Sequence, residues 1–167
     1  MKLAFIDCIT NKIDPFEFVA KTFEEKAADL HPLRFTSPGL LKIPAACHRM
    51  FSEGAEAAIV YVNVAAENQD ELNLVHNKII DAEILSNKFV FLVAVFDEEW
   101  RTPKELDEVT EAKLAEAIEL AVMTVNSPSS LAGEIKPPEP GAFDMFSTPE
   151  TPETETTSSE SQGRKLF

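Results

Sequence analysis

FTSPGLLKIPAACHRMF, residues 35–51, is the stretch from which the fold of this chain can be worked out. An apolar strand is predicted to end near Pro38, because proline holds φ at about −65° and has no N–H to give to a sheet. Gly39 allows the chain to turn. A helix is predicted to begin at Pro44, where the missing N–H costs no hydrogen bond. Such a strand–turn–helix unit opens a ligand crevice in many α/β proteins, although it also occurs as an ordinary connection.

Strand and helix patterns alternate on both sides of this stretch. Apolar runs predict strands at residues 3–6, 33–35, 57–62 and 89–96, and amphipathic or capped stretches predict helices at 14–26, 44–51, 71–85 and 103–124. Crossovers between parallel strands are right-handed, so four such units predict a parallel sheet with helices on both faces. Four loops then meet at the carboxyl ends of the strands, at residues 8–13, 37–42, 63–70 and 97–101.

The composition excludes several classes of partner. A net charge of −14 over 167 residues argues against binding to nucleic acid or to an anionic membrane surface. No apolar run approaches the roughly 20 residues that span a bilayer, and the early Asp7 argues against a secretory signal. The two cysteines, Cys8 and Cys47, have no metal-ligand spacing, and free thiols are typical of a cytoplasmic protein.

The character of the sequence changes after residue 126. We interpret residues 1–126 as the α/β domain, 127–146 as a Pro-rich extension and 147–167 as a disordered acidic tail. The last five residues, 163–167, are basic and apolar. They are either a docking peptide for a partner or a frayed terminus.

Three groups of motifs resemble a known family. They are Leu3–Asp14, with Ile6-Asp7 and Ile13-Asp14; Pro38-Gly39 followed by Ile43-Pro44 and Ala46-Cys47; and Ser86-Asn87-Lys88 followed by an apolar strand, an acidic loop and Lys104–Asp107. Their order and spacing resemble those of the archaeal-type riboflavin synthases, which belong to the lumazine synthase superfamily. The resemblance covers roughly residues 1–125.

This resemblance implies a fold, an assembly and a reaction. The implied fold is a lumazine synthase-like, flavodoxin-like three-layer sandwich around a four-stranded parallel sheet of order 2-1-3-4. The implied assembly is a homopentamer with active sites between neighbouring subunits. The implied reaction is the dismutation of two molecules of 6,7-dimethyl-8-ribityllumazine, in which a four-carbon unit passes from one to the other and gives riboflavin and 5-amino-6-ribitylaminouracil. No organic cofactor is implied, and a magnesium requirement is compatible with the family.

The same resemblance suggests which residues act. His76 is the candidate for proton transfer, since a histidine titrates near neutral pH; the alternative is an exposed histidine on a helix surface. Backbone N–H groups near Gly39 are candidates to bind ring carbonyls, and polar side chains to bind the ribityl hydroxyls. The acidic loop Asp97–Glu99 is interpreted as solvated surface rather than as a metal site. The candidate substrate-binding residues are Asp7, Thr10, Asn11, Ser37, Pro38, Gly39, Lys42 and Asn63.

Two other functions are open. Thr10 stands where the family has an aromatic residue, Phe96 stands where it has a histidine, and residues 63–66 lack its Gly-rich turn. These differences suit a catalytically degenerate pentamer that acts as a binding or scaffold protein. Lumazine synthase itself is a weaker alternative, because the third and fourth loops hold no basic cluster for a phosphate.

Overall fold

The computed structural model describes residues 2–27 and 29–126, with no description of the side chain of His31. The predicted extension at 127–146, the predicted tail at 147–167 and the docking peptide at 163–167 lie outside the described residues. Within the described ranges, no helix combines the length and the apolar character that a bilayer crossing requires.

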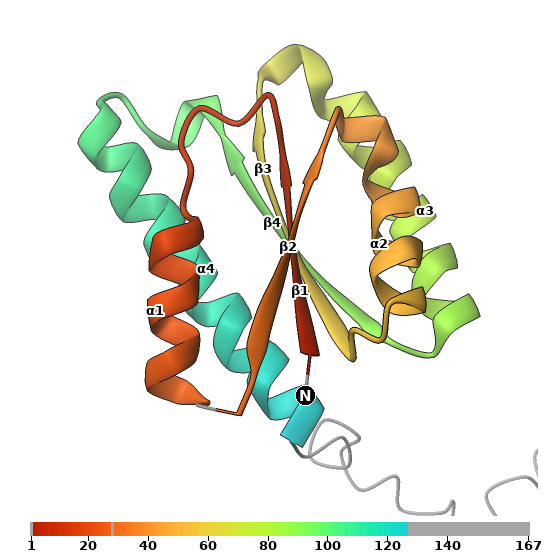
Figure 1. The fold of residues 1–167 in the computed structure, drawn as a ribbon. Coiled ribbons are helices and arrows are strands. Elements are labelled where there is room, and N and C mark those ends of the chain that lie inside the picture. Colours follow the sequence, from red (N-terminus) through yellow and green to blue (C-terminus); the bar gives the residue numbers. More distant parts are fainter. Residues whose placement is uncertain (1, 28, 127–167) are drawn as a thin grey trace, which may run out of the picture. The chain divides into compact units, whose positions relative to one another are not determined.

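Strands and helices alternate throughout the described chain, as the sequence predicts (Figure 1). Short 3₁₀ turns follow three of the strands, at Leu40–Lys42 (η1), Ala66–Asn68 (η2) and Asp97–Glu99 (η3). The main elements are β1 (Lys2–Cys8), α1 (Phe16–Lys26), β2 (His31–Ser37), α2 (Ile43–Ser52), β3 (Ala57–Val64), α3 (Gln69–Ser86), β4 (Phe89–Phe96) and α4 (Pro103–Asn126).

The four strands form one parallel sheet in the order β2-β1-β3-β4, which confirms the predicted fold class and topology. Ile6 is level with Phe35 on one side and with Val60 on the other, and Val60 is in turn level with Leu92. Figure 1 shows this sheet edge-on, with α1 and α4 on one face and α2 and α3 on the other. The chain is therefore a flavodoxin-like three-layer sandwich.

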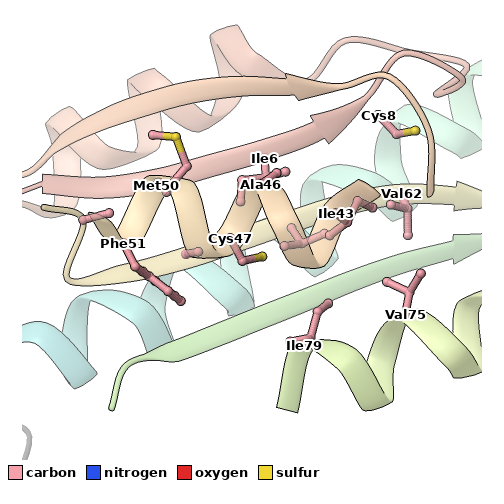
Figure 2. Close-up of a cluster of buried hydrophobic side chains, with 14 of the residues drawn as sticks. Ile6, Cys8, Ile43, Ala46, Cys47, Met50, Phe51, Val62, Val75 and Ile79 are labelled. Carbon is pink, nitrogen blue, oxygen red and sulfur yellow. The ribbon is translucent and has the colours of Figure 1, made fainter. Parts of the chain in front are cut away.

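Each face of the sheet carries a buried apolar layer. Side chains of β1 alternate between the layers: Ala4 and Ile6 belong to the α2–α3 layer, and Leu3 and Phe5 to the α1–α4 layer. β3 lies in the middle of the sheet and is buried on both faces, which explains its unbroken apolar run. In Figure 2, α2 turns its apolar side chains toward the sheet, beside side chains of α3; the labelled residues of these two helices are Ile43, Ala46, Cys47, Met50, Phe51, Val75 and Ile79.

Local hydrogen bonds define the start of α1 and the end of α2. α1 begins at Phe16, one residue later than expected from Asp14 as the helix cap and Pro15 as the first helical residue, and the carboxylate of Asp14 accepts the Phe16 N–H at 3.1 Å. After α2, Gly54 adopts a φ of +94°, and its N–H and that of Ala55 close the helix on the carbonyls of Phe51 and Met50. Because the four strands are parallel, the loops that follow β1, β2, β3 and β4 lie at one rim of the sheet, at the top of Figure 1.

Candidate functional site

Three of the loops at this rim border an open hollow of about 450 Å³, which we call the rim pocket. Thr10 comes from the loop after β1, the segment 38–42 comes from the loop after β2, Asn68 is the last residue of η2 after β3, and Glu71 lies in the first turn of α3. This volume lies within the range of pockets that hold small organic ligands. The full lining is Thr10, Pro38, Gly39, Leu40, Leu41, Lys42, Asn68 and Glu71.

The rim pocket is mixed in chemistry and nearly neutral in charge. Lys42 supplies an ammonium group and Glu71 a carboxylate, while Leu40 and Leu41 supply apolar surface. No side chain caps the N-terminus of α3, which continues directly from η2. One positive and one negative side chain suit a neutral polar ring better than a phosphate.

A side-chain hydrogen bond holds the turn beside the pocket. The buried hydroxyl of Ser37 donates to the carbonyl of Gly39 at 2.8 Å, so Ser37 supports the pocket from beneath. Gly39 has a φ of 177°, which is extended backbone that any residue adopts. A Cβ at Gly39 would meet no atom within 4 Å. The glycine therefore leaves unfilled space there and is not required by the backbone.

Four of the predicted ligand residues line the rim pocket together, and the others lie elsewhere. Thr10, Pro38, Gly39 and Lys42 are at the pocket wall. The side chains of Asp7, Asn11 and Asn63 are engaged in contacts within the fold, and His76 lies outside the pocket.

Asp7 is part of an ion-pair network below the rim. Its buried carboxylate accepts hydrogen bonds from Nε and Nη2 of Arg34, at 3.1 and 2.5 Å. The same Nη2 lies 2.9 Å from the carboxylate of Asp14. Burial alone would lower the pKa of Arg34, but hydrogen bonds and attraction from the two carboxylates raise it above its ordinary value. This arrangement ties β1 to β2 and to the start of α1.

Asn11 and Asn63 bind each other instead of pointing into the rim pocket. The Asn11 amide donates to the carbonyl of Tyr61 at 3.0 Å and accepts the N–H of Asn63 at 2.9 Å. The Asn63 side-chain oxygen in turn accepts the Lys12 N–H at 2.8 Å and the Tyr61 hydroxyl at 3.2 Å. The first loop is thereby fastened to the end of β3.

His76 lines a second hollow, of about 540 Å³, which runs along β4 between α3 and α4. We call this hollow the edge groove. Glu71 and His76 are five residues apart on α3, so they project from the helix about 140° apart. Glu71 lines the rim pocket, whereas His76 is exposed beside Ile80, Lys113 and other groove residues. Within one subunit, His76 does not share a pocket with the predicted ligand residues.

The acidic loop after β4 fits a metal poorly. Asp97 lies 2.6 Å from Lys12, and both carboxylate oxygens of Glu99 lie within 2.7 Å of Lys113. Lysine occupies the lone pairs that magnesium would need. Across the residues that the structure describes, no group of three histidine, cysteine or acidic side chains is placed to hold a metal ion.

Four residues of the rim pocket were not among those predicted from the sequence: Leu40, Leu41, Asn68 and Glu71. Position gives the signal that could have found them, since Leu40, Leu41 and Asn68 lie within the predicted loops at 37–42 and 63–70, and Glu71 directly follows the second of these loops. No family model matches this chain. Its relation to the riboflavin synthases therefore stays a prediction drawn from the motifs.

Proposed function

We propose that this chain is a riboflavin synthase-like transferase that binds 6,7-dimethyl-8-ribityllumazine in the rim pocket. The observation that carries the proposal is the gathering of Thr10, Pro38, Gly39 and Lys42 around one hollow of suitable size. These residues lie on the two loops through which the resemblance relates this chain to the riboflavin synthases. The reaction transfers a four-carbon unit between two lumazines and yields riboflavin and 5-amino-6-ribitylaminouracil.

Each part of the rim pocket has a task in this proposal. The Lys42 ammonium donates to a ring carbonyl, and the flat ring lies against the bare backbone of Gly39. The Thr10 hydroxyl and the Asn68 amide bind ribityl hydroxyls. Glu71 is the carboxylate that takes a proton from the acidic methyl group of the bound lumazine.

The proposal treats His76 as a group that acts on a neighbouring subunit. His76 faces the edge groove rather than its own rim pocket. A proton-transfer role for it therefore needs an adjoining copy whose rim pocket meets this groove. The homopentamer implied by the resemblance would provide such a contact, and a native mass of five chains is its direct test. No step of the proposed chemistry passes through a metal.

A second candidate function is ring binding without catalysis, in a binding or scaffold protein. The observation that favours it is the engagement of Asp7, Asn11 and Asn63 in contacts that hold the fold. With those three side chains engaged elsewhere, Glu71 and Lys42 are the titratable side chains that line the rim pocket. Lumazine synthase is less well supported, because Glu71 opposes the binding of a phosphorylated substrate next to Lys42.

We place this function in the cytoplasm. Cys8 and Cys47 are both buried free thiols, which a reducing compartment preserves. Residues 2–27 and 29–126 provide no membrane-spanning helix.

The decisive experiment incubates the purified full-length protein with 6,7-dimethyl-8-ribityllumazine. Riboflavin formation is followed by fluorescence and chromatography, and lumazine binding by equilibrium dialysis. Lys42→Ala should weaken binding at least tenfold, and Glu71→Gln should lower turnover at least a hundredfold while binding changes little. Asp70→Asn is the matched control, because it removes a neighbouring first-turn charge of α3 outside the pocket.

The outcomes separate the candidates. Product formation that depends on Glu71 supports the transferase. Binding that depends on Lys42, with no product, favours the binding protein. A protein that neither binds nor converts the lumazine overturns both proposals.

A further inference from the structure

The strands β1 and β2 end level with each other, next to the rim pocket. Their last residues, Cys8 and Ser37, are partners in the strand register, and Figure 2 shows Cys8 at the carboxyl end of β1. Cys8 belongs to the apolar layer that α2 and α3 cover, and Ser37 follows Leu33 and Phe35 on the same face of β2. Since paired strands are about 4.8 Å apart, the two buried side chains are neighbours.

Each of these two side chains is hydrogen-bonded to the residue two positions further along its own loop. Ser37 donates to the Gly39 carbonyl at 2.8 Å, and Cys8 Sγ lies 3.1 Å from Thr10 Oγ1. The Ile9 N–H donates to the Ser37 carbonyl at 2.9 Å and so joins the two turns. Ser37 therefore holds a backbone group, whereas Cys8 holds a side chain that lines the rim pocket.

Thr10 differs in this respect from the other polar side chains at the pocket wall. Within the described part of the chain, the side chains of Lys42, Asn68 and Glu71 have no hydrogen-bond partner. Each of them must give up rotational freedom when it binds a ligand. Thr10 is exposed, yet its hydroxyl is already held from the protein side by Cys8. A group that is oriented before binding loses less conformational entropy when the ligand arrives.

We propose that Cys8 is a positioning residue of the rim pocket. Its thiol donates to Thr10 Oγ1 and fixes the rotamer in which the Thr10 hydroxyl donates to an oxygen of the ligand's ribityl chain. Cys8 itself does not touch the ligand and acts only through Thr10. This inference rests on the proposed function, because it assigns the Thr10 hydroxyl to a bound lumazine.

The chemistry of the two groups favours the thiol as the donor. Sulfur is a weak acceptor, whereas a hydroxyl oxygen accepts well, so the thiol proton is best placed on Thr10 Oγ1. The Thr10 hydroxyl then keeps its own proton for another acceptor, and a ribityl oxygen is such an acceptor. Thiol, hydroxyl and ligand form a chain of hydrogen bonds in which each bond polarises and strengthens the next.

The binding test is a double-mutant cycle on the full-length protein, with 6,7-dimethyl-8-ribityllumazine as the ligand and equilibrium dialysis as the measurement. Cys8→Ala and Thr10→Val should each raise the Kd about three- to tenfold, which is the effect of one hydrogen bond. The double variant should bind no more weakly than Thr10→Val alone, because Cys8 acts through the Thr10 hydroxyl. Cys8→Ser keeps a donor at this position and should restore most of the affinity.

Two controls separate positioning from packing. Ser37→Ala removes the adjacent buried side chain, which holds Gly39 instead of Thr10, so its effect on the Kd should add to that of Thr10→Val. Cys47→Ala removes the other buried thiol and should leave the Kd unchanged. In turnover assays Cys8→Ala should raise KM and leave kcat nearly constant, because the Thr10 contact is made in both the ground state and the transition state.

A second measurement needs no ligand. Three-bond NMR couplings to the methyl carbon of Thr10 report the χ1 rotamer of this side chain. We expect one dominant rotamer in the ligand-free wild type, in Cys8→Ser and in Cys47→Ala. In Cys8→Ala the couplings should average over several rotamers, because the hydrogen bond that holds the hydroxyl is lost.

The two measurements distinguish failure of this inference from failure of the proposed function. A fixed Thr10 rotamer that is lost in Cys8→Ala, together with non-additive effects on lumazine binding, supports the inference. Lumazine binding with additive effects of Cys8→Ala and Thr10→Val overturns it and leaves the proposed function standing. Equal rotamer populations in the wild type and Cys8→Ala overturn it as well. A wild type that binds no lumazine overturns the proposed function, and the Thr10 rotamer alone then decides whether Cys8 is a positioning residue.

Discussion

The N–H of Asn63 donates to the side-chain oxygen of Asn11 at 2.9 Å, across 52 positions of sequence. The same Asn11 amide donates to the carbonyl of Tyr61, so one side chain continues the hydrogen bonding of β3 beyond its pairing with β1. The loop that follows β1 is fastened by this contact. The position of Thr10 at the rim pocket therefore depends on a neighbouring residue that does not line the pocket.

Asn11→Ala should destabilise the fold by about 1–3 kcal/mol, because it leaves partly buried groups of Asn63 and Tyr61 without partners. The expected fall in the melting temperature, measured by circular dichroism, is about 3 to 10 °C. Thr10→Ala, an exposed neighbour in the same loop, should melt within a degree or two of the wild type. An Asn11→Ala protein as stable as the wild type would mean that the contact is dispensable.

Gly39→Val should block the rim pocket and leave the fold intact. Gly39 is in an extended conformation and a Cβ there meets open space, so stability should be unchanged or slightly higher. Lumazine affinity should fall at least tenfold, because the new side chain occupies the hollow. Gly54→Val reverses both effects: its φ of +94° makes a valine strained, and Gly54 lies outside the pocket. Full lumazine affinity in Gly39→Val would place the ligand elsewhere.

Glu99 should contribute to the pH dependence of stability. Burial alone would raise its pKa, but hydrogen bonds from Lys113 and the Phe96 N–H hold the pKa below the ordinary value. The stabilisation that Glu99 contributes to the folded state is therefore present above its pKa of about 4.5 in the unfolded chain. This stabilisation is lost as the pH falls through the lower pKa of Glu99 in the folded state. Glu99→Gln should cost about 0.5 kcal/mol at pH 7 and almost nothing at about pH 3. Glu98→Gln is the exposed control, and a constant difference across this range would refute the assignment.

The fold could be predicted from the sequence because it depends on patterns that repeat locally. The run FVFLVAVF gave the bounds of β4 without error, and Pro44 lies in the first turn of α2 as expected. The ends of other elements were less predictable: β3 continues two residues beyond its apolar run, and α3 begins two residues earlier than expected. The position of β4 at the edge of the sheet came from the family resemblance, since its apolar pattern equally suits a central strand.

The site was only partly predictable, because its contacts join residues far apart in sequence. A polar residue at the end of a strand looks the same whether it binds a ligand or holds a loop, and Asp7 is committed to the fold by Arg34, 27 residues away. His76 and Glu71 are both polar residues near the start of α3. The packing of α3 against the sheet decides which of them faces the rim pocket, and the spacing of residues in sequence does not contain that information.

Cys47 should be inert to thiol reagents while the chain is folded. It is fully buried on the face of α2 that packs on the sheet, and burial raises its pKa to about 12. At pH 8 about one thiol in ten thousand is then ionised, so in a Cys8→Ala protein the reaction with an aromatic disulfide should be at least a hundredfold slower than after unfolding. Cys47→Ala, measured in parallel, reports on Cys8 alone. Rapid labelling of Cys47 would require α2 to leave the sheet, and the segment 38–42 that lines the rim pocket would have to move with it.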